Sequence, residues 1–242
     1  MKQTKKLLAF MVMGAALAFA ACGKDDNSTA NDGNNGGTNG GTETAEWVDL
    51  GLPSGLLWAK WNLGATSPEQ FGDYYAWGET AAKDVYNWST YKYCTVDAEG
   101  NLATLTKYNT MRDYGSTPDN LKTLEAMDDA ATQKLCAGAH IPNPDEWHEL
   151  INNTTSEWTT LNGVYGRKFT AANGGSLFLP AAGYRWDDIL YDVGSGYYLT
   201  SSLFGTGSPY NAYVLVLLLD GQVNFGNFRS YGQSVRPVRS TR

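Results

Sequence analysis

The sequence predicts an α+β domain with two helices, small antiparallel sheets and many loops. Aromatic residues make up 13% of the chain, 27 residues are glycine, and only 18% are charged, a composition typical of strands joined by tight turns. Helical spacing of apolar residues occurs in two segments, both near the middle of the chain. Residues 46–242 have the size of one domain, and short apolar stretches bounded by turn residues fill most of it.

The chain starts with the pattern of a bacterial lipoprotein signal peptide, residues 1–21. Three lysines lie within the first six residues, residues 7–21 are apolar, and Cys22 follows two small residues. A spanning helix needs roughly 20 apolar residues, so this stretch is too short to remain in a membrane. We expect cleavage before Cys22 and lipidation of Cys22, with several acyl chains giving stable membrane anchoring. The alternative is a signal peptide that is cleaved without lipidation.

The residues after the cysteine predict the location of the protein. Lys24, Asp25 and Asp26 resemble the lipoprotein export signal of Bacteroidetes, which implies the outer face of the outer membrane. The rest of residues 22–45 consists mainly of Gly, Asn, Thr, Ser and Asp and cannot bury enough apolar surface to fold. We therefore expect a flexible tether between the lipid anchor and the domain.

Charge and cysteine content bear on the partners. The formal net charge of −7 would become −10 without the three lysines of the leader. Because no basic stripe is available to displace counterions, we expect no nucleic-acid partner. Cys94 and Cys136 are the remaining cysteines, and they either form a disulfide or stay as two separate thiols.

The domain is expected to begin with a β-hairpin. Residues 47–50 alternate between apolar and polar, residues 51–55 form a turn signal, and residues 56–59 form the second strand. An aromatic cluster without a clear period follows at residues 71–93.

The first helix is expected between residues 121 and 135, with Gly138 placed to end it. Its apolar residues recur at helical spacing: Leu121, Leu124, Met127, Ala131 and Leu135.

The second helix has the clearest local signature in the chain. Asn143 can cap it, Pro144 suits its first turn, and Glu146 can reach back to the capping residue. Further strands are expected near residue 169 and at residues 176–180, 197–201, 213–219 and 235–238.

Six segments in a fixed order carry a resemblance to a known family. They are residues 47–59, 72–80, 128–131, 141–147, 179–185 and 231–239. Together they resemble surface lipoproteins of gut Bacteroides and are similar to the Fibrobacter succinogenes major paralogous domain. The resemblance implies a C-type-lectin-like fold with two helices, small antiparallel sheets and adjacent termini, and it implies binding without defining a chemistry.

An enzymatic role is not expected. Asp73, Glu79, Asp187 and Asp188 could supply a carboxylate pair, but any acidic domain offers such pairs. Asp128-Asp129 and Asp145-Glu146 are interpreted as first-turn helix residues. His140 and His148 are interpreted as a loop residue and a solvated helix residue, so no metal and no cofactor is expected. The calcium-binding motifs of lectins with this fold are absent from the sequence.

The resemblance implies a ligand surface within residues 198–231. By the same resemblance Tyr213, Leu215 and Leu217 point inward and alternate residues point outward. The expected ligand-binding residues are Leu203, Phe204, Tyr210, Val214, Val216, Leu218, Phe225 and Phe228. The alternative is a central strand that is buried on both faces.

These observations predict a surface lipoprotein that binds a glycan or protein ligand through its C-terminal region. The alternative is a structural or fimbria-associated component of the cell surface without a soluble ligand.

Overall fold

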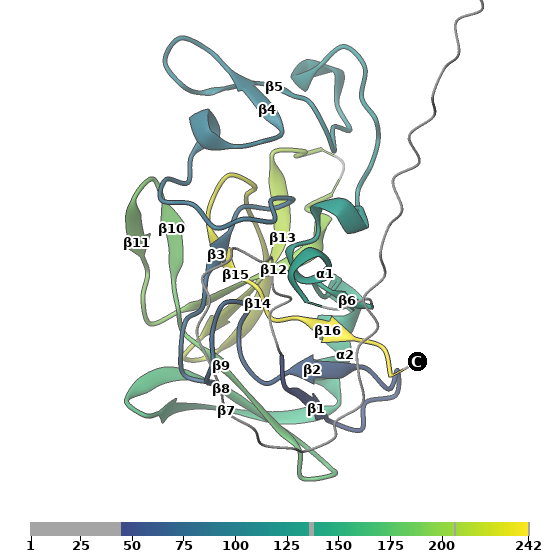
Figure 1. Cartoon of the computed structure of the whole chain (residues 1–242), viewed down its shortest axis with the longest axis vertical. Helices are drawn as coiled ribbons and strands as arrows, with labels where there is room; N and C mark the ends of the chain where they lie inside the picture. Colours follow the sequence, from purple (N-terminus) through teal and green to yellow (C-terminus); the bar gives the residue numbers. More distant parts are fainter. Residues whose placement is uncertain (1–44, 136–137, 206, 242) are drawn as a thin grey trace, which may run out of the picture.

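A computed structural model describes residues 45–135, 138–205 and 207–241 of the chain (Figure 1). The described residues form small sheets with mostly antiparallel pairing, two α-helices and many loops, which agrees with the expected α+β class. The predicted signal peptide, the predicted lipidation site Cys22 and the predicted export residues Lys24, Asp25 and Asp26 lie outside the described residues.

The central sheet has five strands in the order β14-β13-β12-β15-β3. Strands β12, β13 and β14 form an antiparallel meander, whereas β15 pairs with β12 in parallel. The expected strands at 197–201 and 213–219 are therefore confirmed as β12 and β13. The bounds are β3 (Tyr74–Tyr75), β12 (Gly196–Leu203), β13 (Asn211–Leu218), β14 (Gly221–Phe228) and β15 (Gln233–Ser234).

A four-stranded sheet, in the order β1-β2-β16-β6, joins the two ends of the domain. The expected hairpin at the start of the domain is confirmed as β1 and β2, and β16 near the C-terminus pairs with β2. The Arg239 guanidinium also lies 4.6 Å from the centre of the Trp47 ring. The bounds are β1 (Trp47–Asp49), β2 (Leu57–Ala59), β6 (Ala139–His140) and β16 (Val238–Arg239).

Three smaller sheets complete the architecture. The hairpin β4–β5 and the sheet β7–β8–β9 lie at opposite ends of the view in Figure 1, and the hairpin β10–β11 lies to the left of the central sheet. The expected strand at 176–180 is confirmed as β9. The bounds are β4 (Cys94–Val96), β5 (Leu102–Leu105), β7 (Thr154–Leu161), β8 (Val164–Ala171), β9 (Ser176–Pro180), β10 (Tyr184–Trp186) and β11 (Ile189–Tyr191).

The second expected helix is confirmed as α2 (Pro144–Asn152). The side chain of Asn143 accepts a hydrogen bond from the backbone N–H of Glu146, and the Glu146 carboxylate accepts one from Asn143 N–H. This reciprocal cap satisfies two donors at the start of the helix. Trp147 and Leu150 lie on its buried face.

The expected helix over 121–135 is wrong for its first half. Only α1 (Ala130–Lys134) is α-helical, after a 3₁₀ turn η3 (Ala126–Asp128). Leu124 N–H donates to Ser201 O at 2.9 Å and Leu203 N–H donates to Lys122 O at 2.8 Å. This segment therefore pairs its backbone with β12, and tertiary pairing overrides the helical spacing of its side chains.

Two hydrophobic cores fill the described chain. The first, the aromatic core, is built largely from tyrosine and tryptophan, including Tyr75, Trp77, Tyr86, Tyr91 and Tyr108. The second, the Trp58 core, lies under α2 and includes Trp58, Trp147, Leu150, Phe169, Tyr198, Leu215 and Leu217. Both cores consist of residues between 45 and 238, so this segment contains the packing that a folded domain needs.

Arg236 makes its hydrogen bonds with uncharged groups. Its guanidinium is fully buried and donates to Asn62 Oδ1 at 3.0 Å and to the backbone carbonyls of Ala59, Lys60 and Phe178, rather than to a carboxylate. Burial lowers the pKa of Arg236 to about 10. Arg236 therefore links β2 to β9 through carbonyl groups.

Candidate binding surface

Strand β13 is buried on both faces, which corrects the expectation that one face is open. Val214 and Val216, expected to point to solvent, are buried, and Leu218 is half-buried. Val214 lies opposite Leu199 of β12, which belongs to the aromatic core, while Leu215 on the other face belongs to the Trp58 core. The continuous apolar run of β13 reflects this position between two cores.

The other expected ligand-binding residues differ in solvent exposure. Leu203 is buried, Phe204 and Tyr210 are half-buried, and Phe225 and Phe228 are exposed. Of the expected set, Leu203, Val214 and Val216 are too deeply buried to contact a ligand directly.

An aromatic quartet that the sequence did not suggest as a site covers one face of the hairpin β10–β11. It consists of Tyr184, Trp186, Tyr191 and Tyr231. Tyr184 and Trp186 lie two residues apart on β10, and Tyr191 faces Tyr184 across the hairpin. The Tyr184 and Tyr231 rings are 5.5 Å apart at 12°, and Trp186 lies 5.9 Å from Tyr231 at 32°. Tyr184 thus stacks on Tyr191 and Tyr231, Trp186 is tilted by 34° and 32° against the same two rings, and Trp186 is 43% exposed.

Further rings extend the quartet toward β14. Phe228 lies 5.2 Å from Tyr231 and is 38% exposed. Trp88 and Tyr210 lie 6.0 Å and 6.1 Å from Phe228. We call the quartet together with these three rings the aromatic surface.

Backbone pairing on both sides fixes the hairpin that carries the quartet. Arg185 N–H donates to Gly232 O at 2.7 Å, and Gly232 N–H donates back at 2.9 Å. Tyr86 and Asp187 exchange a second pair of backbone hydrogen bonds at 2.8 and 3.0 Å. A Cβ at Gly232 would lie 2.7 Å from the Tyr86 ring, so this close approach requires glycine.

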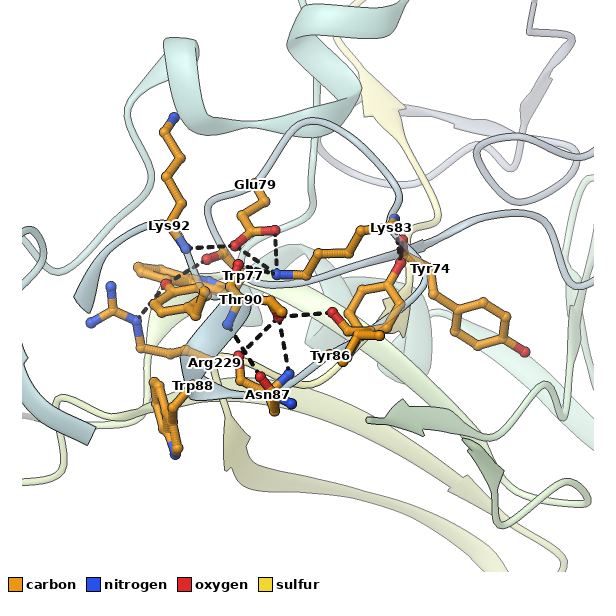
Figure 2. Close-up of polar contacts among 12 residues, drawn as sticks. Tyr74, Trp77, Glu79, Lys83, Tyr86, Asn87, Trp88, Thr90, Lys92 and Arg229 are labelled. Atoms are coloured by element: carbon orange, nitrogen blue, oxygen red, sulfur yellow. Dashed lines mark hydrogen bonds and ion pairs between the residues drawn. The ribbon is translucent and has the colours of Figure 1, made fainter. Parts of the chain in front are cut away.

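Trp88 is held in place by contacts shown in Figure 2. Buried Glu79 accepts hydrogen bonds from Lys83 Nζ and, at 2.8 Å, from Lys92 N–H, and Lys83 Nζ also donates to Thr90 O. Asn87 and Thr90 form a reciprocal cap around the 3₁₀ turn η1 (Trp88–Thr90). The half-buried ion pair between Lys83 and Glu79 therefore fixes the turn that carries Trp88.

An open polar pocket of about 510 Å³ lies beside the same hairpin. Arg185, which alternates with the rings of Tyr184 and Trp186 along β10, lines this pocket and lies 5.3 Å from the Tyr74 ring. The remaining lining residues are Gly72, Asp73, Tyr74, Ala82, Lys83, Asp84, Tyr86 and Asp188. The hairpin thus carries aromatic rings on one face and contributes to a mixed-charge, hydrogen-bonding pocket on the other.

The carboxylates considered for catalysis have different environments. Glu79 is paired with Lys83, and Asp187 Oδ1 accepts a 2.6 Å hydrogen bond from Asn87. Asp73 and Asp188 both line the polar pocket. Across residues 45–135, 138–205 and 207–241, no group of three or more His, Cys, Asp or Glu side chains is placed to hold a metal ion.

Asp128 and Asp129 follow each other in the chain but play different parts. Asp129 is the N-cap of α1 rather than a residue of its first turn, and its side chain accepts a hydrogen bond from Thr132 N–H at 2.9 Å. Asp128 is instead buried and accepts hydrogen bonds from Tyr93, Tyr108 and Lys107. The interpretation of Asp128 as a first-turn helix residue is therefore incomplete.

The remaining expected residues give a mixed result. Cys94 Sγ lies 3.1 Å from Trp88 O, and Cys136 lies outside the described residues, so the disulfide between the two cysteines stays a prediction. His140 ends β6 rather than lying in a loop, and its Nε2 contacts Glu146 at 3.0 Å. His148 is exposed on α2, as expected.

The sequence contains a local pattern from which most of the quartet could have been predicted. Tyr184-Arg185-Trp186 alternates between aromatic and charged residues, two aspartates follow, and Ile189-Leu190-Tyr191 is a second short apolar stretch. This is the pattern of a short hairpin with aromatic residues on one face. Tyr231 has no such signal, because it reaches the quartet only through the tertiary pairing of Gly232 with β10.

No family model, no curated protein and no solved structure matches this chain. Within the part of the chain that the structure describes, no helix is long and apolar enough to cross a membrane.

Proposed function

We propose that this protein is a lipid-anchored receptor of the outer-membrane surface that binds a glycan through the aromatic surface, without catalysis. The observation that carries the proposal is the cluster of neighbouring, partly exposed aromatic rings around Trp186 and Tyr231. Monomeric proteins rarely expose contiguous apolar rings, and where they do the patch commonly serves binding.

Sugar chemistry fits these rings. One face of a pyranose consists largely of C–H groups, and it stacks on an aromatic ring whose electron-rich face is open. Hydroxyl groups of a further sugar unit need hydrogen-bonding partners, and the polar pocket on the opposite face of the same hairpin offers Arg185 and Asp188 to a glycan long enough to cross the hairpin. Such binding needs no calcium ion.

The architecture supports a C-type-lectin-like fold as part of the proposal. Two helices, small antiparallel sheets and many loops agree with what the resemblance implies. The two ends of the domain meet in the sheet β1-β2-β16-β6, and Phe228 and Tyr231 place part of the aromatic surface in the C-terminal region. The lipid anchor and the outer-membrane location rest on the pattern of residues 1–26.

The experiment is binding of residues 45–242 to a glycan array and a host-protein array, with and without a calcium chelator. We expect glycan binding that the chelator leaves unchanged. Replacing Trp186 with alanine removes a stacking ring, so Trp186→Ala should weaken binding about tenfold. The control is Tyr165→Ala, which removes an exposed ring outside the aromatic surface.

Other outcomes would replace the proposal. Binding to a protein with equal loss in Trp186→Ala would make the aromatic surface a protein-binding site. Binding that Trp186→Ala leaves intact would place the site elsewhere. A blank on both arrays would favour the structural or fimbria-associated role.

A further inference from the structure

Strand β14 forms an unpaired edge of the central sheet. It pairs with β13 along its full length, from Gly221 opposite Leu218 to Phe228 opposite Asn211. No other strand of the described chain pairs with it, because β14 is the first strand in the sheet order. Its outer side therefore presents a row of backbone donors and acceptors.

The register shows which backbone groups point outward. Residues 219–220 form a two-residue turn, so the flanking residues Leu218 and Gly221 exchange hydrogen bonds, and the pattern then alternates along the ladder. The N–H and C=O groups of Gln222 and Gly226 accordingly point away from β13. These groups are free to pair with another strand.

Strand β14 also lacks the features that usually protect an edge. Proteins block exposed edges with charged residues, prolines, bulges or very short strands. Residues 221–228 contain no charge and no proline, and the register with β13 has no shift. Val223 and Phe225, two residues apart and on one face, are 49% and 56% exposed.

Two other edges among the described sheets are protected. The opposite edge of the same sheet is β3, which has two residues, both buried. The other eight-residue edge strand, β7, carries Glu157 near its middle. The lack of protection is thus specific to β14 among these edges.

We propose that β14 pairs antiparallel with β14 of a second copy of this chain, which joins the two central sheets into one. The net charge of −7 makes two copies repel each other over most of their surfaces, but two β14 strands bring no like charges together. Antiparallel pairing of a strand with its own copy is two-fold and self-complementary. It also brings Val223 and Phe225 of each copy together on one face.

The dimer would carry two aromatic surfaces. If each binds a repeating ligand weakly, both together bind it more tightly through their effective concentration. The pairing itself does not depend on the proposed function.

The experiment is sedimentation equilibrium of residues 45–242, which contain both hydrophobic cores. We expect a reversible dimer. Phe225→Lys places like charges at the centre of the paired strands and should weaken dimerisation at least about tenfold. The control Leu219→Lys adds the same charge at the hairpin turn, where the side chain is 73% exposed, and should leave the dimer intact.

Two further measurements test the pairing itself. A mixture of Phe225→Lys and Phe225→Glu chains should recover the dimer, because the charges then attract. Amide exchange at Gln222 and Gly226 should be slow in the dimer and fast in Phe225→Lys, with equal thermal stability of both proteins. A single-chain mass at all concentrations, a dimer that survives Phe225→Lys, or fast exchange at these amides in the dimer would overturn the proposal.

Discussion

The buried Arg229 guanidinium donates a hydrogen bond from Nε to the hydroxyl oxygen of Tyr91 at 2.9 Å, and Tyr91 in turn donates to Trp77 O at 2.7 Å. Arg229 also donates to the carbonyls of Tyr108, Pro209 and Lys107. Its cation lies 4.9 Å from the centre of the Trp77 ring. The Arg229 side chain thus connects the backbone directly after Phe228 to the aromatic core. It thereby fixes the position of Phe228, which belongs to the aromatic surface.

Replacing this arginine should strongly destabilise the protein. Lysine keeps the charge but cannot donate in the planar, branched geometry, so Arg229→Lys leaves several buried carbonyls unpaired. We expect a loss of about 3 kcal/mol in the free energy of unfolding, measured by urea titration. The matched control is Arg112→Lys at an exposed position, with an expected change below about 0.5 kcal/mol. Equal stability of Arg229→Lys and wild type would show that its carbonyl contacts contribute little.

Asp128 should make the free energy of unfolding depend on pH in the acidic range. Burial alone would raise the pKa of this carboxyl, but hydrogen bonds from Lys107, Tyr93 and Tyr108 lower it to about 2. Because the pKa in the unfolded chain is about 3.9, the stabilisation is present above about pH 4 and lost as the pH falls to about 2. We expect the difference in unfolding free energy between wild type and Asp128→Asn to shrink by up to about 2 kcal/mol over this range.

The control for Asp128 is the second carboxylate that contacts Lys107. Glu125 is largely exposed, and Glu125→Gln should change stability little at any pH. Urea titrations of all three proteins between neutral and acidic pH provide the measurement. A difference between wild type and Asp128→Asn that stays constant with pH would contradict the assignment of the lowered pKa to Asp128.

Local patterns in the sequence were sufficient where neighbouring residues determine the structure. The hairpin β1–β2 follows from two alternating stretches around a turn, and α2 follows from Asn143, Pro144 and Glu146. In both cases the decisive hydrogen bonds join residues close in the chain. Such elements can be predicted without knowing the rest of the fold.

Prediction failed where distant segments decide. The stretch from Leu121 to Leu124 has helical spacing but pairs with β12, and Asp128 turns into a buried network with Tyr93 and Lys107. The sequence of β13 could not predict whether Val214 is exposed. The two-residue period of a strand shows which side chains share a face, but it does not show whether another part of the protein covers that face. The aromatic surface combines residues from 88 to 231, and only its hairpin leaves a local pattern.

The contact between His140 and Glu146 should stabilise the protein less as the pH rises, whereas the contribution of Asp128 decreases as the pH falls. Burial would lower the pKa of the imidazole, but the hydrogen bond from Nε2 to Glu146 raises the pKa above its ordinary value. Because the unfolded pKa is about 6.5, this stabilisation is fully present below about pH 6.5 and is lost as the pH rises through the raised folded value. Glu146 also caps α2, so the charged imidazole stabilises a carboxylate that holds the start of the helix.

We therefore expect the advantage of wild type over His140→Gln in unfolding free energy to decrease between about pH 6 and about pH 8. An advantage of equal size at both pH values would assign the stabilisation to neutral hydrogen bonding alone.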